Sequence, residues 1–282
     1  MPRELTAGVL FIVLAAGVTH ATWNAITKWI EDRLVVFAWI GVSLVVCAVI
    51  ALPLTGLPAE TAIWFAVASA AIHVVYDFAL MNAYRLGAFN QAYPIARGTS
   101  PLLVAIGAAV FAGERLDLLP LIGILLLAAG LISLAFSGGR VDRSETPAVL
   151  AALGTGVTIA AFSLIDGIGI RRTPDPYSYM AFLFLLEGPT FIVLTALRRS
   201  PGDWVRDKRA VRGLTAGFLS AVTYGAVMWA QTKAPLAEVS ALRETGVISA
   251  AVIGALFFKE RFGVRRVGAA MVVALGIVLI SR

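Results

Sequence analysis

Charged residues are scarce in this chain of 282 residues. Asp, Glu, Lys and Arg together make up 14% of it, whereas about 25% is usual in soluble globular domains. Hydrophobic residues account for 59%, and the mean hydropathy is +0.87. Because this excess extends over the whole length, a single signal peptide does not explain it. The composition therefore excludes an ordinary soluble protein and predicts an integral membrane protein.

The residues and motifs of common catalytic and metal sites are also missing. The chain has one cysteine, Cys47, so an intrachain disulfide is impossible. It has two histidines and no HExxH or CxxC pattern, so we expect no metal site and no cofactor. It lacks a GxxxxGK[ST] motif for ATP and a GxSxG nucleophile motif. We therefore expect no catalytic residues, and a protein that is not an enzyme.

Long apolar segments recur from one end of the chain to the other. A membrane helix needs about 20 mainly apolar residues, and the alternating pattern of a membrane β-barrel is not seen. The sequence predicts an all-α integral membrane protein with ten transmembrane helices. The expected spans are 6–28, 34–53, 61–84, 90–112, 118–137, 148–170, 177–197, 211–232, 236–258 and 263–281.

The two halves of the chain are similar to each other. A shift of 146 residues aligns RGTSPLLVAIGAAVFAGERL with RETGVISAAVIGALFFKERF, so that Arg97 falls on Arg243. The expected repeats are residues 1–137 and 147–282, joined by a polar loop at 138–146. Since each repeat crosses the membrane an odd number of times, the second would insert upside down relative to the first. Inverted repeats are typical of secondary transporters, which bind their substrate near the midplane between the repeats.

Several motifs carry a resemblance to a known family. The turns GERL and KERF end the fourth span of each half, and an apolar span with a late glycine follows each turn. With the duplication, these features resemble the EamA-type transporters of the drug/metabolite transporter (DMT) superfamily over essentially the whole chain. The stretches HATWNAITK, HVVYDFALMNAYRLG and YPIARG look like one bacterial branch of it.

This resemblance has consequences for fold and function. It implies a basket of ten helices in the bacterial inner membrane. The first four helices of each half would surround a central cavity, while the fifth and tenth would support it from outside. Family members carry many different small metabolites, so the likeness names no substrate.

Two arginines lie inside apolar spans, at equivalent positions of the two halves. An arginine at the bilayer centre costs at least ~2.5–3.5 kcal/mol, so Arg97 and Arg243 should face the protein interior. In YPIARGTSP, Pro94 and Pro101 flank Arg97 and predict a bent helix. The arginines could be structural ion-pair partners, for instance of Glu244. Their equivalent placement instead favours binding of an anionic substrate group, which a planar guanidinium holds with two hydrogen bonds.

Other polar and aromatic residues extend this hypothetical site. The residues expected to bind substrate are Arg97, Arg243, Thr99, Tyr93, Asn24, Trp23 and Trp229. The residues considered for coupling to protons are Glu187, Asp77, His73, His20 and Glu244. His73 and Asp77 share one helix face, and a histidine–carboxylate pair can exchange protons near neutral pH. The alternative is that this pair only holds helices together, and that the tryptophans only pack.

Two carboxylates near span ends are expected at the membrane surface and not in the substrate site. Glu114 lies in a turn beside Arg115, where local capping and a salt bridge at the membrane surface would explain it. Asp166 lies near the end of the sixth span and is expected at the membrane interface.

The sequence as a whole predicts a secondary transporter for a small anionic or zwitterionic metabolite, working by alternating access as a monomer or homodimer. Its expected partners are the substrate and the lipid bilayer, with protons as candidate coupling ions. The net charge of +6 is attributed to basic loops and not to nucleic-acid binding. A flippase for a lipid-linked head group and a lipid-modifying membrane enzyme are the alternatives.

The orientation in the membrane stays open at this stage. Most basic loop residues follow odd-numbered spans, so the positive-inside rule places both termini outside. The family resemblance implies that both termini are cytoplasmic.

Overall fold

The computed structural model describes residues 4–27, 32–86, 89–136, 145–200, 204, 210–249 and 264–282. These residues form helices and connecting turns, with no strand among them. The helices are α1 (Ala7–Thr27), α2 (Arg33–Thr55), α3 (Glu60–Leu86), α4 (Phe89–Phe111), α5 (Leu118–Ala135), α6 (Thr146–Ile170), α7 (Pro176–Arg198), α9 (Ala210–Lys233), α10 (Leu236–Arg243) and α12 (Val264–Ile280).

Eight of these helices, α1 to α7 and α9, are long and apolar enough to cross a membrane. The chain is therefore an all-α multi-pass membrane protein. The first eight predicted spans end within about two residues of these helices. The apolar part of α12 is shorter, and α10 has eight residues. Residues 138–144 of the expected loop and 250–258 of the expected ninth span lie outside the described residues.

Local sequence signals explain where two of the helices begin. The side chain of Asp32 accepts a hydrogen bond from the backbone N–H of Leu34 at 3.0 Å and caps α2. The side chain of Asp175 caps α7 in the same way, through the N–H of Tyr177 at 3.0 Å. Aspartate is among the preferred residues at this position, because its oxygen satisfies a backbone N–H that has no partner inside the helix.

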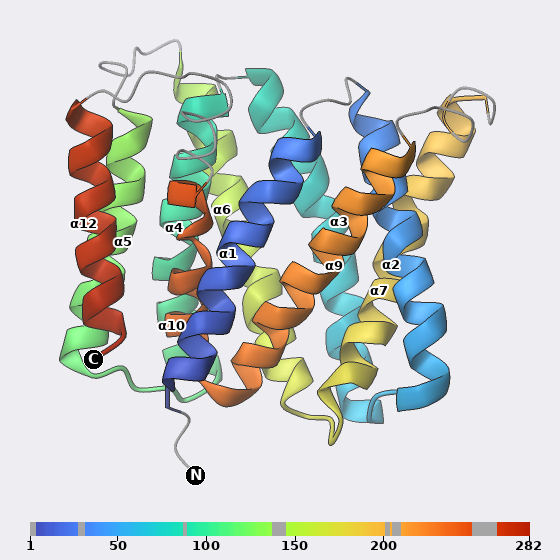
Figure 1. Cartoon of the computed structure of the whole chain (residues 1–282), viewed down its shortest axis with the longest axis horizontal. Helices are drawn as coiled ribbons and strands as arrows, with labels where there is room; N and C mark the ends of the chain where they lie inside the picture. Colours follow the sequence, from blue (N-terminus) through green and yellow to red (C-terminus); the bar gives the residue numbers. More distant parts are fainter. Residues whose placement is uncertain are drawn as a thin grey trace.

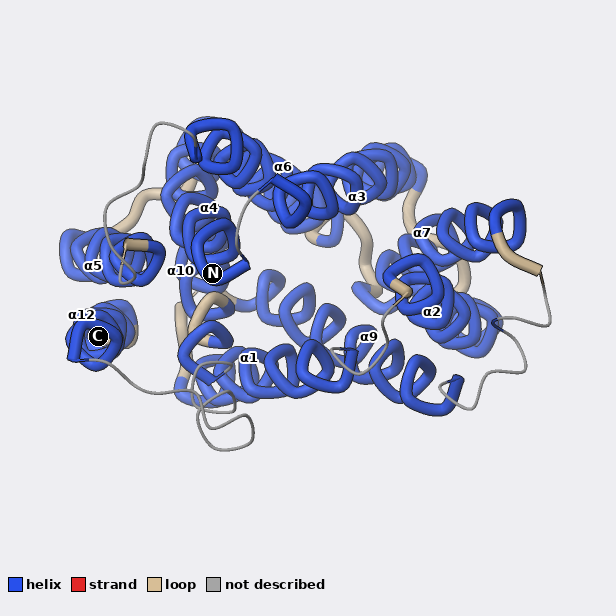
Figure 2. The backbone as a smooth tube through the Cα atoms, turned by 90° about the horizontal axis from the view of Figure 1, so that it is seen from above, coloured by secondary structure: helices blue, strands red, loops and turns tan. Residues whose placement is uncertain are grey.

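The helices surround a central space and form two pairs at opposite ends of the molecule. Seen from above, α5 and α12 pair at one end, and α2 and α7 at the other (Figure 2). The row α4, α6 and α3 lies opposite the row α1 and α9, and α10 lies beside α4 and α1. Both chain termini lie at the same end of the helices (Figure 1).

Contacts between helices recur in a paired pattern between the two halves. The contact of α3 with α6 has a counterpart in α9 with α1, and that of α4 with α6 has one in α10 with α1. The contacts of α2 with α7, α4 with α10 and α5 with α12 each join helices of equivalent order. Each half therefore packs mainly on the other half.

Glycines bring α5 and α12 into close contact. A Cβ atom added at Gly123 would lie 2.7 Å from the backbone oxygen of Gly276, and one added at Gly276 would lie 2.7 Å from the oxygen of Gly123. Small residues let membrane helices approach in this way. Gly123 and Gly276 therefore serve the close packing of α5 on α12.

Replacing Gly276 by alanine is expected to lower the melting temperature of the purified protein in detergent. The added methyl group collides with backbone, and overpacking of this kind costs about 1–3 kcal/mol. No atom of the described residues lies within 4 Å of a Cβ added at Gly268 of the same helix, so Gly268→Ala is the matched control. Equal melting temperatures for the two variants would contradict the close packing of α5 on α12.

Candidate functional site

A cavity of about 830 Å³ lies between the two halves of the chain. Its lining comes from α1, α2, α3 and α4 of the first half and from α6, α7, α9 and α10 of the second. No described residue of α5 or α12 lines it, which agrees with the supporting position expected for the fifth and tenth helices. The polar and charged lining residues are His20, Asn24, Thr27, His73, Tyr76, Asp77, Tyr93, Arg97, Glu187, Thr190, Ser220, Thr223, Tyr224 and Arg243.

The cavity lies toward the end of the molecule that is far from the termini. In α1 the lining begins at His20 and reaches Thr27, the last residue of the helix. In α2 it begins at Val36, close to the helix start, and stops at Leu44. Since α1 runs away from the N-terminus and α2 runs back (Figure 1), these stretches belong to the same far end.

Arg171 and Glu114 join four segments at the other end, where the termini lie. The Nη1 group of Arg171, at the end of α6, donates to Oε1 of Glu114 at 2.6 Å. Arg171 also donates to the backbone oxygens of Gln231 at 2.7 Å and Ala234 at 2.8 Å, at the end of α9. The other oxygen of Glu114 accepts from the N–H of Leu236 at 2.8 Å, at the start of α10. We call this group of contacts the terminus-side latch.

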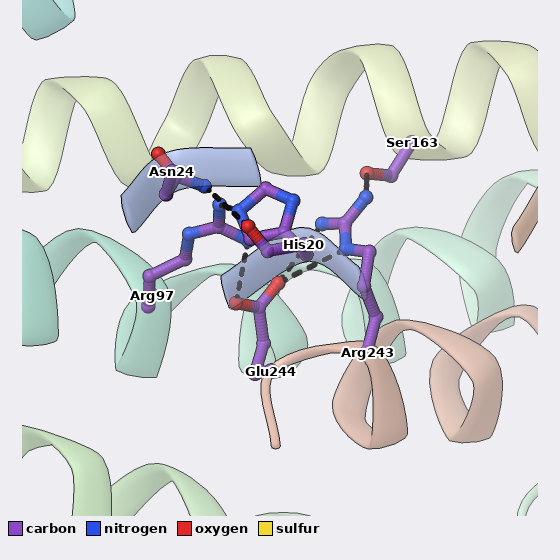
Figure 3. Close-up of polar contacts among 6 residues, drawn as sticks. All are labelled: His20, Asn24, Arg97, Ser163, Arg243 and Glu244. Atoms are coloured by element: carbon purple, nitrogen blue, oxygen red, sulfur yellow. Dashed lines mark hydrogen bonds and ion pairs between the residues drawn. The ribbon is translucent and has the colours of Figure 1, made fainter. Parts of the chain in front are cut away.

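Two arginines and one glutamate form a charged cluster at the cavity wall (Figure 3). Nη1 of Arg97 donates to Oε2 of Glu244 at 2.9 Å. Nε and Nη2 of Arg243 donate to Oε1 of Glu244 at 3.1 and 3.0 Å. Nη1 of Arg243 also donates to the hydroxyl of Ser163 at 3.2 Å. The glutamate therefore bridges the two arginines that the sequence repeat aligns.

The two arginines are ion-paired and also line the cavity. Arg97 and Arg243 are 7% and 6% exposed and line the cavity, yet each is paired with Glu244. Glu244 is fully buried and does not line the cavity. It lies in the turn directly after α10, and this turn lets the neighbouring Arg243 and Glu244 face each other. A charged group inside the cavity meets the guanidinium groups and not the carboxylate.

Residues of α1 and α4 complete this wall. Nη2 of Arg97 lies 2.6 Å from Nε2 of His20. Because a guanidinium only donates hydrogen bonds, Nε2 of His20 must accept this one. His20 is therefore neutral, with its hydrogen on Nδ1. The ring of Trp23 packs edge-on against His20 at 5.0 Å between centroids, and Arg97 lies 5.2 Å from the ring centre of Tyr93. Asn24 lines the cavity and donates to the backbone oxygen of His20 at 2.8 Å.

A second charged group lies in the wall formed by α3 and α7. Nδ1 of His73 lies 2.8 Å from Oε1 of Glu187 and 3.0 Å from the backbone oxygen of Ser69. Both neighbours are acceptors, so Nδ1 carries a hydrogen. Asp77, one helical turn after His73, also lines the cavity. The structure therefore brings three of the residues considered for proton coupling to one part of the wall.

Phe162 separates the two charged groups. Its ring stacks on His73 at 4.0 Å between centroids, and the guanidinium carbon of Arg243 lies 6.0 Å from its ring centre. Tyr224 packs edge-on against both His73 and Phe162. The sequence reading did not select Phe162 or Ser163 for the site. The sequence held a signal, because a looser alignment of the first spans of the two halves, WNAITK from Trp23 beside FSLIDG from Phe162, sets Phe162 and Ser163 against Trp23 and Asn24.

Asp166 is not at the membrane interface, as the sequence reading expected, but fully buried. Its Oδ1 atom accepts from the hydroxyl of Tyr179 at 2.9 Å, and its Oδ2 atom accepts from the hydroxyl of Tyr224. The physical reason is that the end of α6 packs against α7 and α9, which supply both tyrosines. Asp166 therefore holds three helices together behind the cavity wall.

Two residues expected to bind substrate lie outside the cavity lining. The hydroxyl of Thr99 donates to the backbone oxygen of Ile95 at 2.8 Å, and its Cβ faces Gly156 of α6. Trp229 packs between the two largest hydrophobic clusters. The side of α4 and of α9 that each residue occupies faces a neighbouring helix. We leave both residues out of the proposed site.

Residues 146–282 match the EamA-like transporter family. The C-terminal half of this chain belongs to that family. The sequence-based identification as an EamA-type transporter of the DMT superfamily is thereby confirmed. A solved crystal structure with 17% sequence identity has the same fold, with a TM-score of 0.78 over 99% of this chain and 98% of that chain. No protein of curated function matches the sequence.

The EamA assignment indicates the general role of the protein. The chain is a DMT-type membrane transporter, and members of this family are transporters rather than enzymes. A small-molecule substrate and a lipid bilayer follow as its partners. The cavity of this EamA-type protein is the place where both halves present charged side chains to a common space.

Proposed function

We propose that this protein is a secondary transporter of the bacterial inner membrane that carries a small anionic or zwitterionic metabolite by alternating access. The observation that carries the proposal is the placement of Arg97 and Arg243, one from each half, in the wall of one large cavity. Charges at this depth are costly unless they are paired or functional. A cavity of 830 Å³ falls in the size range of small-molecule sites.

The architecture of the proposal is ten membrane helices in two inverted repeats, residues 1–137 and 147–282, joined by 138–146. The paired contacts support it, because exchanging the two halves turns each of the largest contacts between the halves into another that is present. The first helix of each repeat, α1 and α6, also packs in a similar way on the other repeat. A Cβ added at Gly17 of α1 would lie 2.9 Å from Oγ1 of Thr245, and one added at Gly156 of α6 would lie 3.1 Å from Cβ of Thr99. Thr99 and Thr245 are equivalent in the repeat.

The substrate would lie across the cavity between its two charged walls. An anionic group would bind the arginine wall, with Tyr93, Asn24 and Trp23 around it. Glu187 and Asp77 in the other wall favour an ammonium group, or a proton that is exchanged during transport. An uncharged middle part would pack on Phe162.

The test is a stability screen followed by transport. We expect a water-soluble anion or zwitterion to stabilise the purified parent, by about 2.7 kcal/mol at a hundredfold excess over its Kd. Arg97→Gln and Arg243→Gln should lose this effect. Arg199→Gln should keep it, because Arg199 lies in an exposed pair with Asp32. The stabilising compound is then tested for uptake into proteoliposomes.

Two outcomes would overturn the proposal. Equal stabilisation of the parent and both arginine variants by cations would place the substrate elsewhere. Stabilisation only by lipids with a charged head group, without uptake of any soluble compound, would favour a flippase or a lipid-modifying enzyme.

A further inference from the structure

We infer that Glu244 sets the charge of the substrate group that the arginine wall accepts, and that this group carries one negative charge. The inference rests on the proposed function, because it assumes that Arg97 and Arg243 face the substrate. Beyond the proposed function, it assigns a role to Glu244, which does not contact the ligand and nevertheless determines whether a monoanion or a dianion is bound.

The charges of the cluster leave a single positive charge unbalanced. Arg97 and Arg243 are permanent cations. Both oxygens of Glu244 accept from guanidinium groups at 2.9–3.1 Å, which is the geometry of a carboxylate. His20 presents an accepting nitrogen to Arg97 and is therefore neutral, and Ser163 is uncharged. One anionic group in the cavity completes the neutralisation of this wall.

The position of Glu244 makes it a fixed counter-ion and not a competitor for space. It is fully buried and lies behind the arginines as seen from the cavity. Its bonds and the bond to Ser163 use three of the five N–H groups of Arg243. The arginines can therefore keep Glu244 and bind a ligand at the same time.

Binding of a dianion would leave one negative charge without compensation. Its second charge would enter a wall that is already neutral, in a buried site where unpaired charge is strongly unfavourable. Replacing Glu244 by glutamine keeps the shape of the side chain and removes its charge, so that two positive charges face the ligand. At an effective dielectric constant of about 20, one charge a few Å away changes affinity by about tenfold or more.

The experiment compares two probes that differ by one charge at every accessible pH, methyl sulfate and sulfate. Their Kd values are measured by isothermal titration calorimetry on the purified full chain. We expect the parent to prefer methyl sulfate. In Glu244→Gln the ratio of the sulfate Kd to the methyl sulfate Kd should fall about tenfold or more. Asp32→Asn is the control, because it removes a carboxylate that pairs with an arginine outside the cavity, and it should keep the parent ratio.

A second variant keeps the test open if Glu244→Gln does not fold. Ser163→Asp places a new carboxylate beside Arg243 and should weaken the binding of both probes, that of sulfate more. An unchanged ratio in Glu244→Gln, with both probes still lost in Arg97→Gln, overturns the role of Glu244 alone. Binding that does not depend on Arg97, or no binding of either probe to the parent, overturns the arginine site and this inference with it.

Discussion

Replacing Arg171 by methionine is expected to reduce net transport more strongly than any other change outside the cavity. Arg171 is the centre of the terminus-side latch, with bonds of 2.6–2.8 Å to Glu114 and to two backbone oxygens at the end of α9. The paired side chains are only 10% and 14% exposed. Removing one partner of a buried pair costs about 3–5 kcal/mol, because the other charge is left without compensation.

This cost falls on the conformation in which the latch is formed. Alternating access requires that the conformations open to either side have similar free energies. A shift of about 3 kcal/mol changes the population ratio more than a hundredfold, so the variant should remain open toward the terminus side. Substrate would still reach the arginines, and net transport would stall. Substrate binding by Arg171→Met should therefore stay close to that of the parent.

Labelling of a cysteine in the cavity measures this shift. In a background with Cys47→Ala, Thr223→Cys supplies a cavity thiol for a membrane-impermeant maleimide. Labelling from the terminus side should increase in Arg171→Met and in Glu114→Gln. Arg199→Met is the control, since its pair with Asp32 is 43% and 34% exposed and contributes only about 0–1 kcal/mol. Normal transport by Arg171→Met would rule out the latch as a gate.

The fold could be predicted from the sequence because the bilayer fixes the length of an apolar run. The first eight predicted spans agree closely with the helices for this reason. The early end of α10 at Arg243 could not be predicted in this way. Its apolar run continues through Gly246 and Val247, and hydropathy does not register the turn at Glu244 and Thr245.

The partners of the buried charges were harder to predict. Glu114 was expected to pair with the adjacent Arg115, but it pairs with Arg171, 57 positions along the chain. Asp166 was expected at the interface, but it lies between two tyrosines. A membrane helix that is apolar on every side gives no signal for the face that it turns inward. Only the repeat supplied such a signal: it aligned Arg97 with Arg243, and in the structure both bind Glu244.

The charged group at His73 leads to the second large effect that we expect. Replacing Glu187 by glutamine should abolish substrate accumulation driven by a proton gradient and leave exchange of substrate across the membrane intact. Glu187 is the carboxylate 2.8 Å from Nδ1 of His73, and both residues line the cavity. A histidine–carboxylate pair that substrate can reach is suited to bind and release a proton in each cycle. Glutamine keeps the shape but cannot take up the proton.

Two transport assays on the same proteoliposomes separate coupling from binding. The first measures accumulation under an imposed pH gradient, and the second measures exchange of labelled for unlabelled substrate without a gradient. Glu187→Gln should fail only in the first. Asp32→Asn removes a carboxylate from the exposed pair with Arg199 and should pass both. Loss of both activities in Glu187→Gln would make Glu187 a substrate ligand, in contact with an ammonium group. Gradient-driven accumulation that persists in this variant would remove Glu187 from the coupling mechanism and leave Asp77 to carry it.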